Sequence, residues 1–97
     1  MTVPANARRY ARIVMKHNTA AHGSQIFWLR DTNPNWSEAQ SVSFAIQPND
    51  SIYRTYLLDL GANANWIDTT TQVRFDLVTD ASSGTAQLDS FSLCSNP

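Results

Sequence analysis

The stretch Ile26-Phe27-Trp28-Leu29-Arg30 carries four large apolar side chains in a row and a charge at its end. In an extended strand, successive side chains point to opposite faces, so Phe27 and Leu29 share one face and their neighbours share the other. Apolar residues on both faces are typical of a central strand in a packed sheet. We therefore expect a strand over residues 25–30, with one buried face and with Trp28 on a second, partly covered face.

Further stretches on both sides alternate polar and apolar residues with a period near two, and turn residues lie between them. This period, combined with β-branched and aromatic residues, predicts half-buried antiparallel strands. The alternation is unbroken over residues 41–47, where Val42, Phe44 and Ile46 are expected to point inward. The other expected strands cover residues 10–17, 53–60, 72–78 and 86–93, and residues 80–84 are expected to join the last two.

The fold class follows from the number and spacing of these strands. No stretch of about a dozen residues shows helical periodicity. Short strands at regular spacing favour an all-β, antiparallel β-sandwich of jelly-roll type. The chain has 97 residues, of which 42% are hydrophobic and 15% charged, and this composition is typical of one globular domain. We expect that domain over residues 10–94, with tails at 1–9 and 95–97.

The charge pattern argues against nucleic acid and membrane partners. Seven basic and eight acidic side chains give a net charge of −1, whereas nucleic-acid binders carry a broad basic stripe. No apolar run approaches the roughly 20 residues that span a bilayer. The first residues also lack the apolar segment of a signal peptide. The compartment therefore stays open: extracellular for part of a secreted enzyme, cytoplasmic for a stand-alone reading frame.

Taken in order, these stretches resemble galactose-binding-like β-sandwiches, and more narrowly the carbohydrate-binding modules attached to polysaccharide-degrading enzymes. The resemblance covers residues 10–93 and is carried by the order and spacing of several strings. They are Ile26-Phe27-Trp28-Leu29-Arg30, Trp36-Ser37-Glu38 followed by Ser41-Val42-Ser43-Phe44, Tyr56-Leu57-Leu58-Asp59-Leu60, Asn65-Trp66-Ile67, Val73-Arg74-Phe75-Asp76 and Leu88-Asp89-Ser90-Phe91-Ser92-Leu93.

The resemblance also implies that something is missing. Such modules usually carry further strands before the position of Tyr10, so the chain resembles a module shortened at its N-terminus. An incomplete sandwich leaves an unpaired strand edge, which another element or another chain normally covers. We therefore expect a homodimer in which two copies cover each other.

Aromatic residues are the leading candidates for a binding site, because the flat face of a sugar stacks on an aromatic ring while polar groups bond its hydroxyls. Trp36 lies in a loop with Asn33 and Asn35, which supplies that mixture; a lid folded over the core is the alternative interpretation. The resemblance implies a structural plug for Trp66. The remaining candidates for ligand contact are Trp28, for which a place in the core is the favoured interpretation, and Tyr53, Arg30 and Arg74.

No catalytic residue and no cofactor is expected. His17 and His22 are the only histidines and are interpreted as solvated turn residues, although a catalytic triad is assembled in space rather than in sequence. Cys94, the only cysteine, is interpreted as a spare or packed thiol. In the resembling modules an Asp near the start of the last strand helps to hold a structural calcium ion. Asp89 has that position, but the N-terminal ligands are missing, so we expect no metal.

Two functions from different classes remain. The leading one is non-catalytic binding of a polysaccharide or oligosaccharide by aromatic stacking. The alternative is a small self-associating β-sandwich protein without a sugar ligand, encoded on a mobile gene cassette, in which Trp28 anchors the interface. A hydrolase or lyase is the third and least favoured function.

Overall fold

The computed structural model describes residues 2–77 and 84–96. Within them the chain forms strands and single 3-10 turns but no α-helix, and no helix there is long and apolar enough to cross a membrane. The strands are β1 (Val3–Pro4), β2 (Tyr10–His17), β3 (Gly23–Arg30), β4 (Ser41–Ala45), β5 (Arg54–Asp59), β6 (Thr69–Asp76) and β7 (Ala86–Cys94). The 3-10 turns are η1 (Ala5–Ala7), η2 (Glu38–Gln40) and η3 (Leu60–Ala62).

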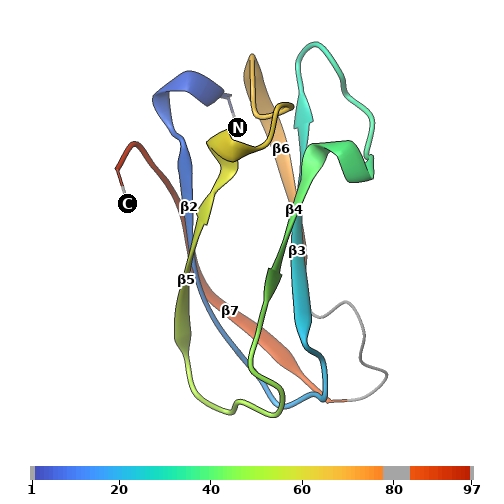
Figure 1. Ribbon diagram of the computed structural model, residues 1–97, viewed down its shortest axis with the longest axis vertical. Coiled ribbons are helices and arrows are strands. Elements are labelled where there is room, and N and C mark those ends of the chain that lie inside the picture. The colour runs from blue at the N-terminus through green and yellow to red at the C-terminus, as the bar shows by residue number, and fades with distance from the viewer. Residues whose placement is uncertain (1, 78–83, 97) are drawn as a thin grey trace.

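The strands form two antiparallel sheets that face each other, as Figure 1 shows. One sheet has the order β1-β6-β3-β4 and the other the order β5-β2-β7. Aromatic pairs bridge the two sheets: the ring centroids of Phe44 and Tyr56 are 5.3 Å apart, and those of Phe75 and Phe91 are 4.8 Å apart. The expectation of an all-β chain with a sandwich-like core is therefore confirmed.

The core lies between the inner faces of the sheets, as the alternation predicted. In β2 the inward residues Ala11, Ile13 and Met15 are at most 1% exposed. In β4, Val42 and Phe44 pack against the same core. Full burial of one such side chain is worth about 1.5–3 kcal/mol, so the two inner faces supply the main stabilising contribution.

The assignment of the two faces of β3 was wrong. Trp28 is fully buried between the sheets, and Phe27 lies on the outer, partly covered face. The rings of Trp28 and Trp66 pack in a T-shaped arrangement at a centroid distance of 5.1 Å. Its Nε1 donates to the Asn65 carbonyl oxygen at 3.1 Å. A buried indole needs such an acceptor, and residues 65–66 supply both the partner ring and the carbonyl.

Part of the expected N-terminal tail is packed against the sandwich. Val3 and Pro4 pair with the start of β6, and Ala5 is 2% exposed. Trp66 holds this segment, because its Nε1 donates to the carbonyl oxygens of Ala5 at 3.2 Å and Arg8 at 2.8 Å. Trp66 is 5% exposed, which confirms the structural role expected for it.

Several strand boundaries differ from those expected. β3 begins two residues earlier, at Gly23, and β6 begins three residues earlier, at Thr69. The early start of β6 reflects its pairing with β1, which the sequence interpretation did not include. The expected strand end at Val78 and most of the expected turn at 80–84 lie outside the described residues.

Candidate functional site

Most of the candidate binding residues gather at one end of the sandwich, in and beside the loop of residues 31–37 that follows β3 (Figure 1). This loop begins with a tight turn, in which the backbone N–H groups of Arg30 and Asn33 each donate to the other residue's carbonyl oxygen at 3.1 Å. The Asn35 side chain then donates to Asn33 Oδ1 at 3.3 Å. The two asparagines named from the sequence therefore contact each other just before Trp36.

A buried glutamine holds the loop in place. Gln40 is 1% exposed, and its Nε2 donates to the carbonyl oxygens of Trp28 at 3.2 Å, Asn33 at 3.3 Å and Asn35 at 3.2 Å. Its Oε1 accepts a hydrogen bond from Arg30 Nε. Because buried polar groups must be paired, this one amide ties the loop to β3 through four contacts. Gln40 was not among the residues expected to matter.

Arg30 is a structural residue of this loop. It is 9% exposed, and besides Gln40 it contacts Asp68, with Nη1 3.1 Å from Oδ2. The same carboxylate oxygen accepts from Thr32 Oγ1 at 2.6 Å. Asp68 has a φ of +61°, in the left-handed region that few non-glycine residues adopt. The guanidinium is therefore occupied by protein groups rather than offered to a ligand.

Arg74 contacts two aromatic rings on the outer face of the four-stranded sheet. Its guanidinium carbon is 4.2 Å from the centroid of Phe27, its cross-strand neighbour, and 5.0 Å from that of Trp36. Cations are attracted to aromatic faces, so Arg74 holds the Trp36 ring against the sheet. The Arg74 Nε is also 3.5 Å from Asp76 Oδ1.

Polar groups surround this arrangement. Gln25, which shares the outer face of β3 with Phe27, donates through Nε2 to Glu38 Oε2 at 2.6 Å and to Ser41 Oγ at 3.0 Å. Trp36 itself is 38% exposed. We call Gln25, Phe27, Trp36, Glu38 and Arg74 the Trp36 platform. It combines an exposed indole with amide, carboxylate and guanidinium groups on one face.

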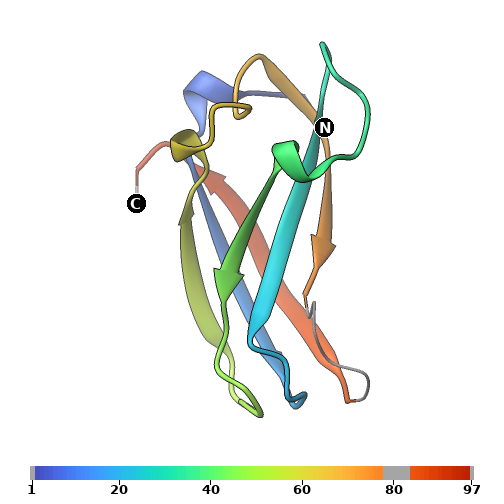
Figure 2. The ribbon, with the colours of Figure 1, turned by 45° about the vertical axis from the view of Figure 1, so that its right-hand side comes forward.

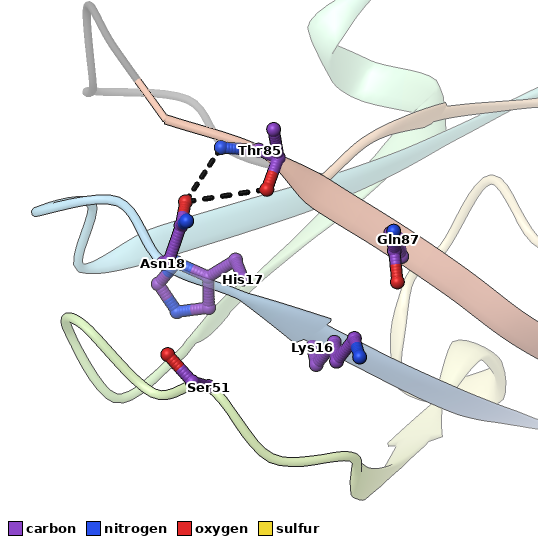
Figure 3. A pocket seen from close by; sticks show the side chains of 6 residues that line it. All are labelled: Lys16, His17, Asn18, Ser51, Thr85 and Gln87. Atoms are coloured by element: carbon purple, nitrogen blue, oxygen red, sulfur yellow. Dashed lines mark hydrogen bonds between the residues drawn. The ribbon is translucent and has the colours of Figure 1, made fainter.

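The segment between β4 and β5, which carries Tyr53, lies at the opposite end of the sandwich from the loop of residues 31–37 (Figure 1). The structure therefore does not bring Tyr53 together with Trp36. Tyr53 is 47% exposed; Lys16 Nζ lies 4.7 Å from its ring centroid, and its hydroxyl lies 3.3 Å from Gln87 Oε1. Both of these partners line a shallow pocket of about 210 Å³. Figure 3 shows its lining residues, Lys16, His17, Asn18, Ser51, Thr85 and Gln87.

This pocket is largely committed to internal contacts. Asn18 Oδ1 accepts from the backbone N–H of Thr85 at 2.6 Å and lies 3.3 Å from its hydroxyl, as the dashed lines in Figure 3 show. His17 is 3% exposed, and its ring nitrogens contact Thr19 Oγ1 at 2.9 Å and the Gln47 carbonyl oxygen at 2.6 Å. The expectation that His17 is a solvated turn residue was therefore wrong, whereas His22 is exposed.

The remaining candidates fall outside the platform. Trp28 has no exposed ring face for a ligand or for an interface, since it belongs to the core. Asp89 is exposed on β7, and Cys94 is half-buried with its sulfur 3.7 Å from Ser92 Oγ. Among residues 2–77 and 84–96, no three His, Cys, Asp or Glu side chains lie close enough together to hold a metal ion.

Comparison with known proteins gives no relative: no protein-family model, no curated protein and no solved structure matches this chain.

Proposed function

We propose that this chain is a non-catalytic carbohydrate-binding protein that binds polysaccharide or oligosaccharide at the Trp36 platform. One observation carries the proposal: an exposed indole ring is held by a guanidinium beside several polar side chains. Sugar rings present C–H groups that pack on an aromatic face, and their hydroxyls need hydrogen-bonding partners around that face.

Preorganisation supports this function. Trp36 contacts Arg74, and the loop that carries it is tied down by the buried Gln40 amide. A ring that is already oriented loses less conformational entropy when a ligand binds. The platform lies on a sheet face rather than in a deep pocket, so we expect affinity to be modest for a single sugar unit.

The sheet topology supports the finer fold assignment as a galactose-binding-like jelly roll. β2 pairs with β5 and β7, and β3 pairs with β4 and β6, so each central strand is flanked by strands that follow it in the chain. This is Greek-key winding, and jelly rolls combine two Greek keys in eight strands. In an eight-stranded jelly roll, the third strand pairs with the sixth and the eighth, and the fourth strand pairs with the fifth and the seventh. β2–β7 form the same pairs when they are counted as the third to eighth strands. The first two strands would lie beside β7 and β6.

The proposal is tested by electrophoresis of the purified chain through gels that contain a panel of polysaccharides. Binding retards migration, and we expect Trp36→Ala to lose at least about tenfold in affinity, since a stacked anchor contributes on the order of 1.4 kcal/mol or more. Trp36→Tyr keeps an aromatic face and should retain part of the binding. Tyr53→Ala is the matched control, because it removes an exposed aromatic ring at the opposite end.

Three results would contradict the proposal. They are the absence of retardation by every polysaccharide, full retardation of Trp36→Ala, and loss of binding in Tyr53→Ala with Trp36 intact. Circular dichroism of each variant establishes that the sheets remain folded.

A further inference from the structure

In the part of the chain that the structure describes, each sheet has a strand edge on the same side of the molecule that is unpaired over most of its length. Within the described residues, β7 pairs only with β2. In the same residues, β6 pairs with β3 on one side, and on the other it pairs with β1 only at Thr69 and Thr70. Figure 2 shows β6 in orange and β7 in red, with β6 on the side away from β4 and β5. We call β7 and the uncovered part of β6 the open rim.

The open rim exposes the edge of the core. Phe75 of β6 and Phe91 of β7 pack edge to face across the two sheets at 4.8 Å and 75°, and both are only partly buried. Leu93 and Leu77 are also partly buried, and Leu88 is 39% exposed. The apolar interior of the sandwich is therefore incompletely covered at this side.

The usual protection of an edge strand is confined to one part of β7. Proteins block such edges with lysine, proline or short strands, but β7 is nine residues long and contains no Lys, Arg or Pro. Its single charge is Asp89, which the pairing with β2 skips in a β-bulge between Ser90 and Leu88. From Ser90 to Cys94 the edge is regular and uncharged, as a strand that accepts a neighbour would be.

We propose that a second copy of this chain covers the open rim, in a two-fold dimer in which β7 pairs antiparallel with β7 of the second copy. The axis passes beside the Phe75–Phe91 pair. The interface of a two-fold dimer must be self-complementary, because the same surface of both copies takes part in it. In this dimer, the free edge of each β7 pairs with the free edge of the other. The inference is independent of carbohydrate binding.

The charge of Asp89 disfavours one register of the β7 pair. With the axis at Phe91, Ser90 of one copy lies opposite Ser92 of the other, and Asp89 lies opposite Leu93. A register centred on Asp89 would instead place two carboxylates directly opposite each other, which is destabilising.

In the other sheet, the same axis lies at Phe75, because Phe75 and Phe91 face each other across the core. Arg74 of one copy then lies opposite Asp76 of the other, so opposite charges meet. The two sheets thus favour one common axis, and the four phenylalanine rings form the centre of the interface. Aromatic residues are enriched at such centres.

The first test is the molar mass by light scattering over a range of concentrations up to about 100 μM, where a weak dimer is populated by mass action. We expect twice the 10.8 kDa of one chain. Leu88→Lys places a cation on the open rim and should raise the dissociation constant at least tenfold. Leu57→Lys is the matched control, since Leu57 is 45% exposed on β5, the opposite edge of the same sheet, and it should leave the dimer unchanged.

A second test uses disulfide cross-linking to determine the register of the two β7 strands, and it does not depend on a destabilising substitution. In a Cys94→Ser background, Ser90→Cys and Ser92→Cys chains are mixed and oxidised. The mixture should form a disulfide-linked dimer, whereas each variant alone should give several-fold less. A monomeric mass at every concentration, a dimer resistant to Leu88→Lys but not to Leu57→Lys, open-ended oligomers, or equal cross-linking in all samples would overturn the proposal.

Discussion

At the scale of single residues, the loop that carries Trp36 depends on one buried amide. Gln40 lies seven residues after Asn33 and five after Asn35, and it accepts from Arg30 while donating to the carbonyl oxygens of both asparagines. A loop of mostly polar residues has no core of its own, so its conformation is set by whichever buried group satisfies its backbone. The position of Trp36 in the platform therefore depends on a buried side chain beneath the loop.

We expect Gln40→Met to lower the free energy of unfolding by about 2–4 kcal/mol, because the change removes the acceptor of the buried Arg30 Nε and the amide donor to three carbonyl oxygens. Urea unfolding measures the loss. Gln72→Met, at an exposed position on β6, is the control and should change stability by no more than about 0.5 kcal/mol. A Gln40→Met chain as stable as the control would show that the amide does not hold the loop.

The Arg9–Asp59 pair predicts a dependence of stability on pH. Arg9 Nε and Nη2 donate to the two carboxylate oxygens at 2.7 and 2.9 Å, and these bonds lower the pKa of Asp59. A carboxylate with a lower pKa in the folded chain stabilises it above the unfolded pKa of about 3.9. That contribution is lost as the pH falls through the folded pKa.

Asp59→Asn should therefore be less stable than the wild type at pH 7, and the difference should shrink as the pH falls below about 4. Urea unfolding across this range measures it. In an Arg9→Met background the difference at pH 7 should be much smaller, because the partner that lowers the pKa of Asp59 is absent. A difference in unfolding free energy between wild type and Asp59→Asn that stays unchanged at low pH would contradict this account.

At the scale of elements, the alternation of apolar residues predicted the bounds and inward residues of β2 and the core face of β4. β3 was harder, because both of its faces are apolar and periodicity alone does not tell which is buried. The deciding group is Trp66, far away in sequence, whose ring packs on Trp28. β1 has only two residues, so it carries no period, and its pairing with β6 depends on tertiary contacts.

The residues of the candidate site also fall into those that the sequence predicted and those that it did not. The sequence identified Trp36, its asparagine neighbours and Arg74, because their residue types carry the chemistry. It did not identify Gln40, Asp68 or Phe27, whose roles come from contacts across strands and loops. A buried arginine such as Arg30 requires paired polar groups, but its sequence position does not say which ones.

Trp66 pins the N-terminal segment to the sandwich, and this contact is testable. Trp66→Phe keeps an aromatic ring but removes the donor to the carbonyl oxygens of Ala5 and Arg8. We expect a loss of about 1–3 kcal/mol in unfolding free energy. Hydrogen exchange should also rise about tenfold or more at the Ala5 amide, which donates to the Asp68 carbonyl oxygen at 2.8 Å. Unchanged protection of that amide would show that the segment is held by other contacts.

At the scale of the whole molecule, the two proposals have a joint consequence. Arg74 contacts Trp36 and lies one residue from Phe75, where the two-fold axis is placed. Dimerisation would therefore put two Trp36 platforms on one continuous sheet face. Two linked weak sites bind a long polymer more tightly than a short one, because the second contact is intramolecular.

Leu88→Lys should consequently separate polymer binding from oligomer binding. We expect its affinity for a short oligosaccharide to stay within about twofold of the wild type, while its affinity for the matching polysaccharide falls at least about tenfold. Calorimetry on both ligands measures this. An equal loss for both ligands, or none for either, would show that the open rim and the platform do not act together.

The central claim is tested most directly by tryptophan fluorescence during titration with a panel of oligosaccharides and soluble polysaccharides, with and without calcium. Trp28 and Trp66 are at most 5% exposed, so a response to ligand reports on Trp36, which is 38% exposed. We predict a saturable blue shift or quenching with at least one glycan, and its loss in Trp36→Phe. A flat response across the panel, or a response that survives Trp36→Phe, would contradict the assignment of the Trp36 platform as a carbohydrate-binding site.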